Sequence, residues 1–261
     1  MSDQNTKILW QPSQKRIDQS NIIKFMDTVE TDWNINLRDF DELYEFSVQE
    51  AEKFWQSLIS FAEVVSETWG EDVLRNPGKM PGSIWFPDAK LNYAENLLRI
   101  RDDTDALVFW GEDKVKLKFS HEELYNEVSR VAQALLAMGL VPGDRVGGYM
   151  PNMPQTIIAM LAAVSIGATW SSCSPDFGVQ GVLDRFGQIK PKVIFVSDGY
   201  FYNGKVHDVI RKTSQIVSQL PSVEGAVVIP YCNPKPVIDD VANSILWDDF
   251  VRDFNDSEIE F

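Results

Sequence analysis

The amino-acid sequence predicts an α/β fold, a parallel sheet flanked by helices, preceded by a mainly helical or irregular arm rich in aromatic residues. From about residue 105 onwards, short apolar runs alternate with helical patterns across short connections, which builds a parallel sheet with helices on both faces. The first 100 residues lack strand-like runs and hold five of the eight tryptophans. We therefore expect an arm over residues 1–100 and an α/β domain over residues 101–261.

Composition and charge exclude several classes of protein. The chain has 261 residues, of which 44% are hydrophobic and 24% charged, an ordinary globular balance. The 24 Lys and Arg against 39 Asp and Glu give a net charge of −15, so a general nucleic-acid binder is not expected. Cys173 and Cys232 are the only cysteines, which excludes a disulfide framework and a zinc knuckle and fits the reducing cytoplasm.

No export or membrane segment is expected. The first 14 residues lack the apolar core of a signal peptide. The most apolar stretch, residues 157–170, is interrupted by Ser, Gly and Thr and is shorter than the ~20 residues that span a bilayer.

The arm contains one clear helix prediction. Ser47 and Glu50 have the spacing of a capping box, and apolar residues recur at helical intervals over residues 51–65, with Gly70 as the expected stop. The Pro- and Gly-rich segment 76–82 predicts a loop. Because aromatic side chains bury much area, the tryptophans are expected to anchor the arm rather than to bind a ligand.

A short helix over residues 92–99 leads into a predicted hairpin. Residues 106–110 and 115–119 are strand-like runs joined by a turn, and lysines alternate with apolar residues along the second run, which predicts one solvated face. A helix with a Ser–Glu capping box follows over residues 120–139.

Alternating strands and helices then build the predicted sheet. Strands are predicted over residues 144–150, 168–172, 192–197 and 226–229, and helices over residues 155–166, 179–189, 206–220 and 245–254. Ligands bind beyond the carboxyl ends of the strands in such sheets. The candidate loops are therefore residues 151–154, 173–178 and 198–205.

The third loop nearly matches a phosphate-binding loop. Gly199 is followed at the required spacing by Gly204 and Lys205, but Val206 stands where magnesium binding requires Ser or Thr. The bulky residues 200–202 would also prevent the loop from wrapping a triphosphate. A P-loop NTPase is therefore not expected, and an unrelated nucleotide-binding α/β domain remains only as an alternative.

A weaker ligand prediction survives in this loop. Lys205 is expected where a helix begins, and free backbone N–H groups there favour an anion, while Tyr202 offers a flat face for a base. The alternative is a surface lysine beside a packed aromatic ring. The sequence contains neither GxGxxG nor GxSxG, and His121 and His207 lack ligand spacing, so no catalytic residue and no metal ligand is predicted.

Three phrases resemble acetoacetyl-CoA synthetases, which belong to the adenylate-forming acyl-CoA synthetase superfamily. They are WFPDAKLNYAENLL at residues 85–98, GDRVGGYMPN at residues 143–152 and GATWSSCSPDFG at residues 167–178. The resemblance runs from about Leu9 to Phe261. The first and third phrases separate the acetoacetyl branch from the acetyl branch, and acetyl-CoA synthetase or another short- or medium-chain acyl-CoA synthetase is the alternative.

The resemblance implies the N-terminal subdomain of the acyl-CoA synthetase fold and a two-step ligase reaction. A carboxylate attacks ATP, with Mg, to give an acyl-adenylate, and the thiol of CoA then displaces AMP. The Ser/Thr/Gly-rich phosphate loop of the family is not in this sequence, and its other catalytic segments would follow residue 261. We therefore expect the N-terminal part of an acetoacetate–CoA ligase, inactive by itself, or a non-enzymatic CoA- or partner-binding module derived from one.

The resemblance also implies a CoA site. In acetyl-CoA synthetases two arginines, three residues apart, contact the nucleotide end of CoA, and the alignment places Tyr202 and Lys205 at these positions, next to Gly204. Lysine keeps the charge but not the planar fork of arginine. A truncated sheet would leave an apolar face exposed, so a homodimer through that face is expected.

Overall fold

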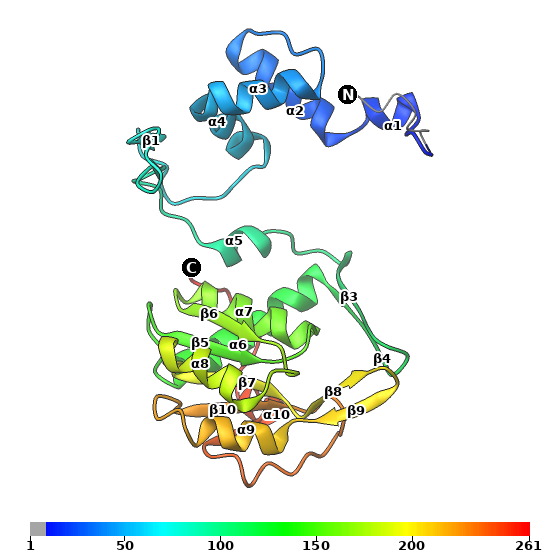
Figure 1. Ribbon diagram of the computed structural model, residues 1–261, viewed down its shortest axis with the longest axis vertical. Coiled ribbons are helices and arrows are strands. Elements are labelled where there is room, and N and C mark those ends of the chain that lie inside the picture. The colour runs from blue at the N-terminus through cyan, green and yellow to red at the C-terminus, as the bar shows by residue number, and fades with distance from the viewer. Residues whose placement is uncertain (1–8) are drawn as a thin grey trace, which may run out of the picture. The chain divides into compact units, whose positions relative to one another are not determined.

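The computed structural model describes residues 9–261 (Figure 1). Residues 1–8, most of the segment on which the absence of a signal peptide rests, lie outside this part. The described chain forms two units, one that ends at Leu91 and one over Asn92–Phe261. Residues 92–100, which the sequence analysis places in the arm, thus belong to the second unit.

The first unit is built mainly from helices. They are α1 (Gln14–Asp18), α2 (Asn21–Trp33), α3 (Phe40–Gln49) and α4 (Ala51–Phe61), followed by the two-residue antiparallel strands β1 (Leu74–Arg75) and β2 (Ile84–Trp85). The predicted loop over residues 76–82 joins β1 to β2. Phe25, Met26, Val29 and Leu43 form the buried core of this unit, between α2, α3 and α4.

The predicted helix start at Ser47 is wrong. Asp39 caps α3 eight residues earlier, where its carboxylate accepts from the backbone N–H of Glu42 at 3.1 Å. Ser47 lies inside α3 and donates its hydroxyl to the carbonyl oxygen of Tyr44. The helical conformation is interrupted at Glu50, between α3 and α4. Helix α4 ends at Phe61 rather than near Gly70, and Glu63 already has a left-handed conformation.

The second unit begins with a short helix and a hairpin. They are α5 (Tyr93–Leu97) and the antiparallel strands β3 (Asp105–Gly111) and β4 (Val115–Ser120). Helix α6 (His121–Ala137) follows directly, and the capping box predicted at Ser120 and Glu123 is confirmed in both directions.

A parallel sheet of five strands forms the body of the second unit in the order β11-β10-β7-β5-β6. The strands are β5 (Arg145–Tyr149), β6 (Thr169–Cys173), β7 (Val193–Ser197), β10 (Gly225–Ile229) and β11 (Ser244–Leu246), and the helices are α7 (Pro154–Ser165), α8 (Val179–Ile189), α9 (Ile210–Val217) and α10 (Trp247–Phe250). The predicted fold class is confirmed.

Both faces of this sheet are covered, which explains why its central strands are continuous apolar runs. In β7, Phe195 packs into the core that contains α6 and α7, while Ile194 and Val196 pack into the core that contains α8 and α9. The alternation follows from the two-residue period of a strand. Residues Val193–Ser197 are all buried.

Two predicted helices begin too early. Residues predicted as a loop and the start of a helix form a hairpin of β8 (Gly199–Tyr202) and β9 (Lys205–Asp208), and α9 starts only at Ile210. The reason is local: Asn203 and Gly204 both have positive φ, +50° and +71°, and an Asn-Gly pair is a strong two-residue hairpin signal. Likewise Ile245 belongs to β11, so the last helix is confined to α10.

Candidate ligand site at the carboxyl edge of the sheet

The strand order reverses beside β5, because β6 lies on one side of it and β7 on the other. Ligands of open parallel sheets bind at such a switch point, beyond the carboxyl ends of the strands. A pocket with a cavity volume of about 470 Å³ lies there. It is lined by Pro151, Asn152, Ser174, Pro175, Asp176, Tyr200, Phe201, Tyr202 and Tyr231.

Two of the three loops predicted to form this edge do supply the pocket walls, and the third does so as a hairpin. Residues 151–152 follow β5 and residues 174–176 follow β6, while residues 200–202 belong to β8. Tyr231 comes from the loop after β10, which the sequence analysis does not single out. Aromatic rings and a few polar groups in a concave site are typical of small-molecule pockets.

Asp198 fixes the wall that carries Tyr231. Its side chain is 4% exposed and accepts hydrogen bonds from the backbone N–H groups of Tyr231 (2.8 Å), Cys232 (2.8 Å) and Asn233 (2.6 Å). Three consecutive donors form an anion-binding concavity that is filled by this carboxylate. Asp198 therefore ties the loop after β10 to the end of β7.

Two tyrosines of this edge, Tyr149 and Tyr231, are neutral at pH 7. Burial raises the pKa of Tyr231 to about 12 and that of Tyr149 to about 12. The Tyr149 hydroxyl lies 2.8 Å from the carbonyl oxygen of Pro175 and 2.9 Å from that of Phe177, so it holds the loop after β6.

A Cβ at Gly111 would lie 2.3 Å from the Tyr231 hydroxyl, so the glycine of β3 makes room for that phenol.

The structure brings the three predicted CoA contacts together at the tip of the β8–β9 hairpin. Tyr202 and Lys205 are directly paired across the hairpin, Tyr202 is 68% exposed, and only Tyr202 lines the pocket. Lys205 does not begin a helix, so the expected support from helix N–H groups is wrong. The context of a P-loop, a strand followed by a loop and a helix, is absent for the same reason.

An acidic residue already occupies the backbone donor at this tip. The N–H of Gly204 donates to Glu112 Oε2 at 3.0 Å, which links the turn of the β8–β9 hairpin to the turn of the β3–β4 hairpin. Figure 1 shows the ends of these two hairpins meeting at one side of the sheet. A phosphate at this point therefore has the exposed ammonium of Lys205 beside it but no free Gly204 N–H.

Metal and nucleophile candidates add little at this site. Over residues 9–261, no three His, Cys, Asp or Glu side chains come close enough together to hold a metal ion. Burial raises the pKa of the Cys232 thiol to about 12, so this cysteine is protonated at pH 7 and is a weak nucleophile.

None of the helices within residues 9–261 is both long and apolar enough to cross a membrane.

The sheet order and the pocket at its switch point define an α/β domain of the nucleotide-binding type. The chain belongs to the AMP-binding enzyme family, whose model matches residues 97–245. Residues 40–97 match the family described as the acetyl-coenzyme A synthetase N-terminus. The two matches cover parts of both units.

Individual relatives confirm the resemblance to acetoacetyl-CoA synthetases. The chain is 42% identical over 254 residues to acetoacetyl-coenzyme A synthetase of Rhizobium meliloti (strain 1021), which covers 97% of this chain and 39% of that protein. It is 42% identical over 250 residues to acetoacetyl-CoA synthetase of Xenopus tropicalis, covering 94% of this chain and 37% of that protein.

A solved structure shares the fold. Acetoacetyl-CoA synthetase from Streptomyces lividans matches with a TM-score of 0.89 and 35% identity, covering 98% of this chain and 39% of that one. The chain thus spans less than two fifths of the length of each of these three proteins.

Proposed function

We propose that this chain is the N-terminal part of an acetoacetate–CoA ligase. The observation that carries the proposal is identity of 42% to acetoacetyl-CoA synthetases over 94–97% of the chain, which includes the loops that line the carboxyl-edge pocket. The names of these relatives supply the substrate, because we assign no residue of this chain to binding the acid. ATP, Mg and CoA are the proposed co-substrates of the longer enzyme.

The proposed reaction has two balanced steps. An oxygen of the acetoacetate carboxylate attacks the α-phosphorus of ATP, and the bond to pyrophosphate breaks. The sulfur of CoA then attacks the acyl carbon, AMP leaves with the bonding electrons, and the thiol proton passes to a base or to water. Residues 9–261 supply no metal cluster, and we assign no catalytic residue to them.

This chain contributes a site for the nucleotide end of CoA in our proposal. Tyr202 would stack on the adenine, and the ammonium of Lys205 would pair with a phosphate. The support is the position of both side chains on one cross-strand pair beside the pocket. Gly204 sets the tight turn between them through its positive φ, which L-residues adopt with strain.

We further propose that the protein acts in the cytoplasm and self-associates as a dimer. The low cysteine content supports the first point. The second rests on individual exposed apolar side chains of the second unit, of which Leu136 (52% exposed) and Val141 (57% exposed) are examples, since a second copy that covered them would remove apolar area from water. Light scattering that gives a monomer at high concentration would contradict the dimer.

ATP–pyrophosphate exchange tests the ligase proposal. Residues 1–261 alone should show no exchange with acetoacetate. The same chain, fused to the part of the Rhizobium meliloti relative that follows the matched region, should exchange pyrophosphate only when acetoacetate is present and form the thioester when CoA is added. Exchange by residues 1–261 alone, or a folded fusion that activates acetate but not acetoacetate, would contradict the proposal.

A non-enzymatic CoA- or partner-binding module is the second candidate. Its support is the pocket at the carboxyl edge of the sheet, beside which Tyr202 and Lys205 form a cross-strand pair. The candidate predicts that the chain binds CoA in an isothermal titration but that the fused protein neither exchanges pyrophosphate nor forms the thioester, and this second outcome separates it from the ligase proposal.

A further inference from the structure

The pocket at the carboxyl edge of the sheet has two chemically different sides. The aromatic side consists of four rings from β8 and from the loop after β10, those of Tyr200, Phe201, Tyr202 and Tyr231. The polar side comes from the loops after β5 and β6 and consists of Asn152, Ser174 and Asp176. The proposed CoA contacts involve none of these three polar side chains.

The side chains of the polar side are free to bind a ligand. Asn152, Ser174 and Asp176 are all exposed, and none of the three side chains has a hydrogen bond or an ion pair within residues 9–261. A ligand can therefore pair with them without displacing a protein partner.

The backbone around Asp176 is held in place from below. The Tyr149 hydroxyl lies within hydrogen-bond distance of the carbonyl oxygens of Pro175 and Phe177, the residues on either side of Asp176. Because one buried hydroxyl contacts both neighbours, the position of Asp176 is set before a ligand binds. Such preorganisation lowers the entropy lost on binding.

The loop after β5 is tied to the same edge. Thr156 Oγ1 donates to the carbonyl oxygen of the residue before Asn152 at 2.7 Å. The N–H of Met150 donates to the carbonyl oxygen of Cys173 at 3.2 Å, which joins the start of this loop to the end of β6. Asn152 and Asp176 thus stand on two linked loops that line one pocket.

The rings of the aromatic side support one another. Tyr200 stacks on His207 with ring centroids 4.9 Å apart, and Phe201 meets Tyr231 edge to face at 5.2 Å. Tyr202 is 68% exposed and keeps an open face. A flat base stacked on Tyr202 presents its edge, and not its face, to the other groups that line the pocket.

The chemistry of the polar side matches the edge of adenine. Adenine presents an amino donor at N6 next to ring nitrogens that accept. A carboxylate only accepts and an amide also donates, so Asp176 suits the amino group and Asn152 suits a ring nitrogen. Guanine has a carbonyl oxygen where adenine has the amino group, and the carboxylate of Asp176 repels that oxygen.

We propose that Asp176 and Asn152 select the base of the bound nucleotide. Asp176 accepts a hydrogen bond from the N6 amino group of adenine, and the amide of Asn152 donates to a neighbouring ring nitrogen. The inference rests on the proposed CoA site and names the residues that make this site specific for adenine. The phosphate lies outside the pocket beside Lys205, since Asp176 repels it.

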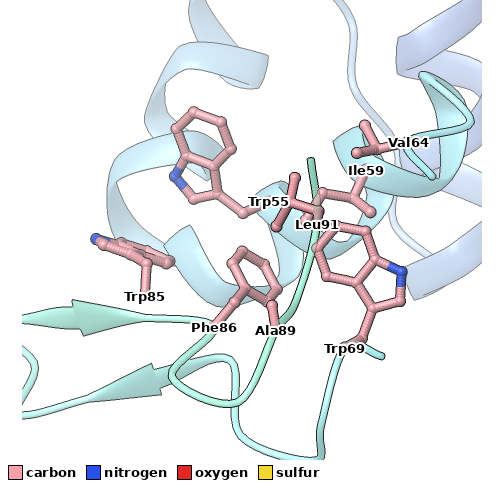
Figure 2. Close-up of a pocket in the computed structure, with 8 residues that line it drawn as sticks. All are labelled: Trp55, Ile59, Val64, Trp69, Trp85, Phe86, Ala89 and Leu91. Carbon is pink, nitrogen blue, oxygen red and sulfur yellow. The ribbon is translucent and has the colours of Figure 1, made fainter. Parts of the chain in front are cut away.

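A second aromatic surface, in the first unit, offers stacking without recognition of the base. Trp55, Trp69, Trp85 and Phe86 line an open groove with a cavity volume of about 640 Å³ (Figure 2). The other described residues of its lining are aliphatic, so indole nitrogens are the only polar side-chain atoms among them. A base stacked there has no acceptor for its amino group, and a test of base selection must separate the two surfaces.

Etheno-CoA tests the role of Asp176. In this analogue a bridge of two carbons joins N1 and N6 of adenine, which removes the amino hydrogens but keeps the phosphates and the thiol arm. In isothermal titrations of residues 1–261, we expect CoA to bind about five- to tenfold more tightly than etheno-CoA. Asp176→Ala should reduce this ratio to about twofold or less, and Asp176→Asn, which keeps an acceptor oxygen, should retain part of it. Both ligands carry the same phosphates, so the ratio cancels the effect of the lost charge.

Matched variants test the location. Asn152→Ala should weaken CoA binding by about two- to fivefold. Asp239→Ala and Asn36→Ala remove exposed side chains of the same types elsewhere and should leave the affinity for CoA unchanged, and Trp85→Ala should leave the ratio of the two affinities unchanged.

Two results would overturn the proposal in different ways. If CoA binds but the ratio is near one, or is the same in Asp176→Ala, base selection by Asp176 is wrong while the CoA site stands. If neither ligand binds at millimolar concentration, the proposed CoA site is wrong and base selection falls with it.

Discussion

The backbone N–H of Gly204 donates a 3.0 Å hydrogen bond to the carboxylate of Glu112, and this bond joins the turns of two hairpins. A carboxylate therefore stands where the proposed CoA phosphate would approach Lys205. The two anions repel each other across a short distance. The affinity of the tip for phosphate should accordingly depend on the charge of Glu112.

Replacing Glu112 by Gln should strengthen CoA binding by about two- to threefold. The amide oxygen still accepts from Gly204, so the hairpin contact is kept while the negative charge is removed. Isothermal titration of CoA into both proteins at the same ionic strength measures the change. Unchanged or weaker binding in the folded variant would show that Glu112 does not face the phosphate.

Lys205→Ala should weaken CoA binding by about two- to fivefold, the size expected for one exposed ion pair. Dephospho-CoA, which lacks the 3′-phosphate, shows whether that phosphate is the partner, because the variant and the wild type should then bind it equally. Lys235→Ala removes another exposed lysine and serves as the control. A similar loss in both variants would mean that only net charge matters.

Asp198→Asn should lower the free energy of unfolding by about 2–4 kcal/mol. The amide cannot accept from all three backbone N–H groups of residues 231–233, and its own NH₂ group faces donors. Urea unfolding measures the difference, with Asp239→Asn, an exposed aspartate, as the control. A stability loss no larger than that of the control would refute the anchoring role of Asp198.

The stability of the protein should fall between pH 9 and pH 12. Burial raises the pKa of Tyr149 from 10.0 to about 12 and that of the Cys232 thiol from 9.0 to about 12. Above pH 9 to 10 the unfolded chain releases these protons while the folded chain keeps them, so the stabilisation from the buried neutral forms is present below that range and is lost as pH rises.

Tyr149→Phe isolates the tyrosine contribution. The variant has no phenol to ionise, so its stability should fall less steeply over this pH range than that of the wild type, although it is less stable at pH 7 because two carbonyl oxygens lose a hydroxyl donor. Urea unfolding at pH 8, 10 and 11 gives both slopes. Identical slopes would contradict the role assigned to this hydroxyl.

The sheet was readable from the sequence because its strands are buried on both faces. Val193–Ser197 and Gly225–Ile229 are continuous apolar runs between helical patterns, and two core layers need that pattern. The capping box at Ser120 is likewise a local signal with a local outcome. The family resemblance came from contiguous phrases, which need no knowledge of packing.

The sequence predicts a loop and a helix start over Gly199–Asp208 because its near-match to a phosphate-binding loop masks the Asn203-Gly204 turn signal, and the structure has a hairpin there. Ser47 and Glu50 have the spacing of a capping box, but Asp39 caps the helix that contains Ser47. Tyr231 and Asp198 are 33 residues apart and meet only in the folded chain. The sequence signal for this contact is Asp198, an aspartate that directly follows an apolar strand. An ionised group at such a position needs hydrogen-bond donors.

The most direct test of the carboxyl-edge site is an amide NMR titration of residues 1–261 with CoA. Saturable shifts of the Tyr202, Gly204 and Tyr231 amides are expected, with those of α3 in the first unit unchanged. Shifts that cluster away from these residues, or none at millimolar CoA, would contradict it.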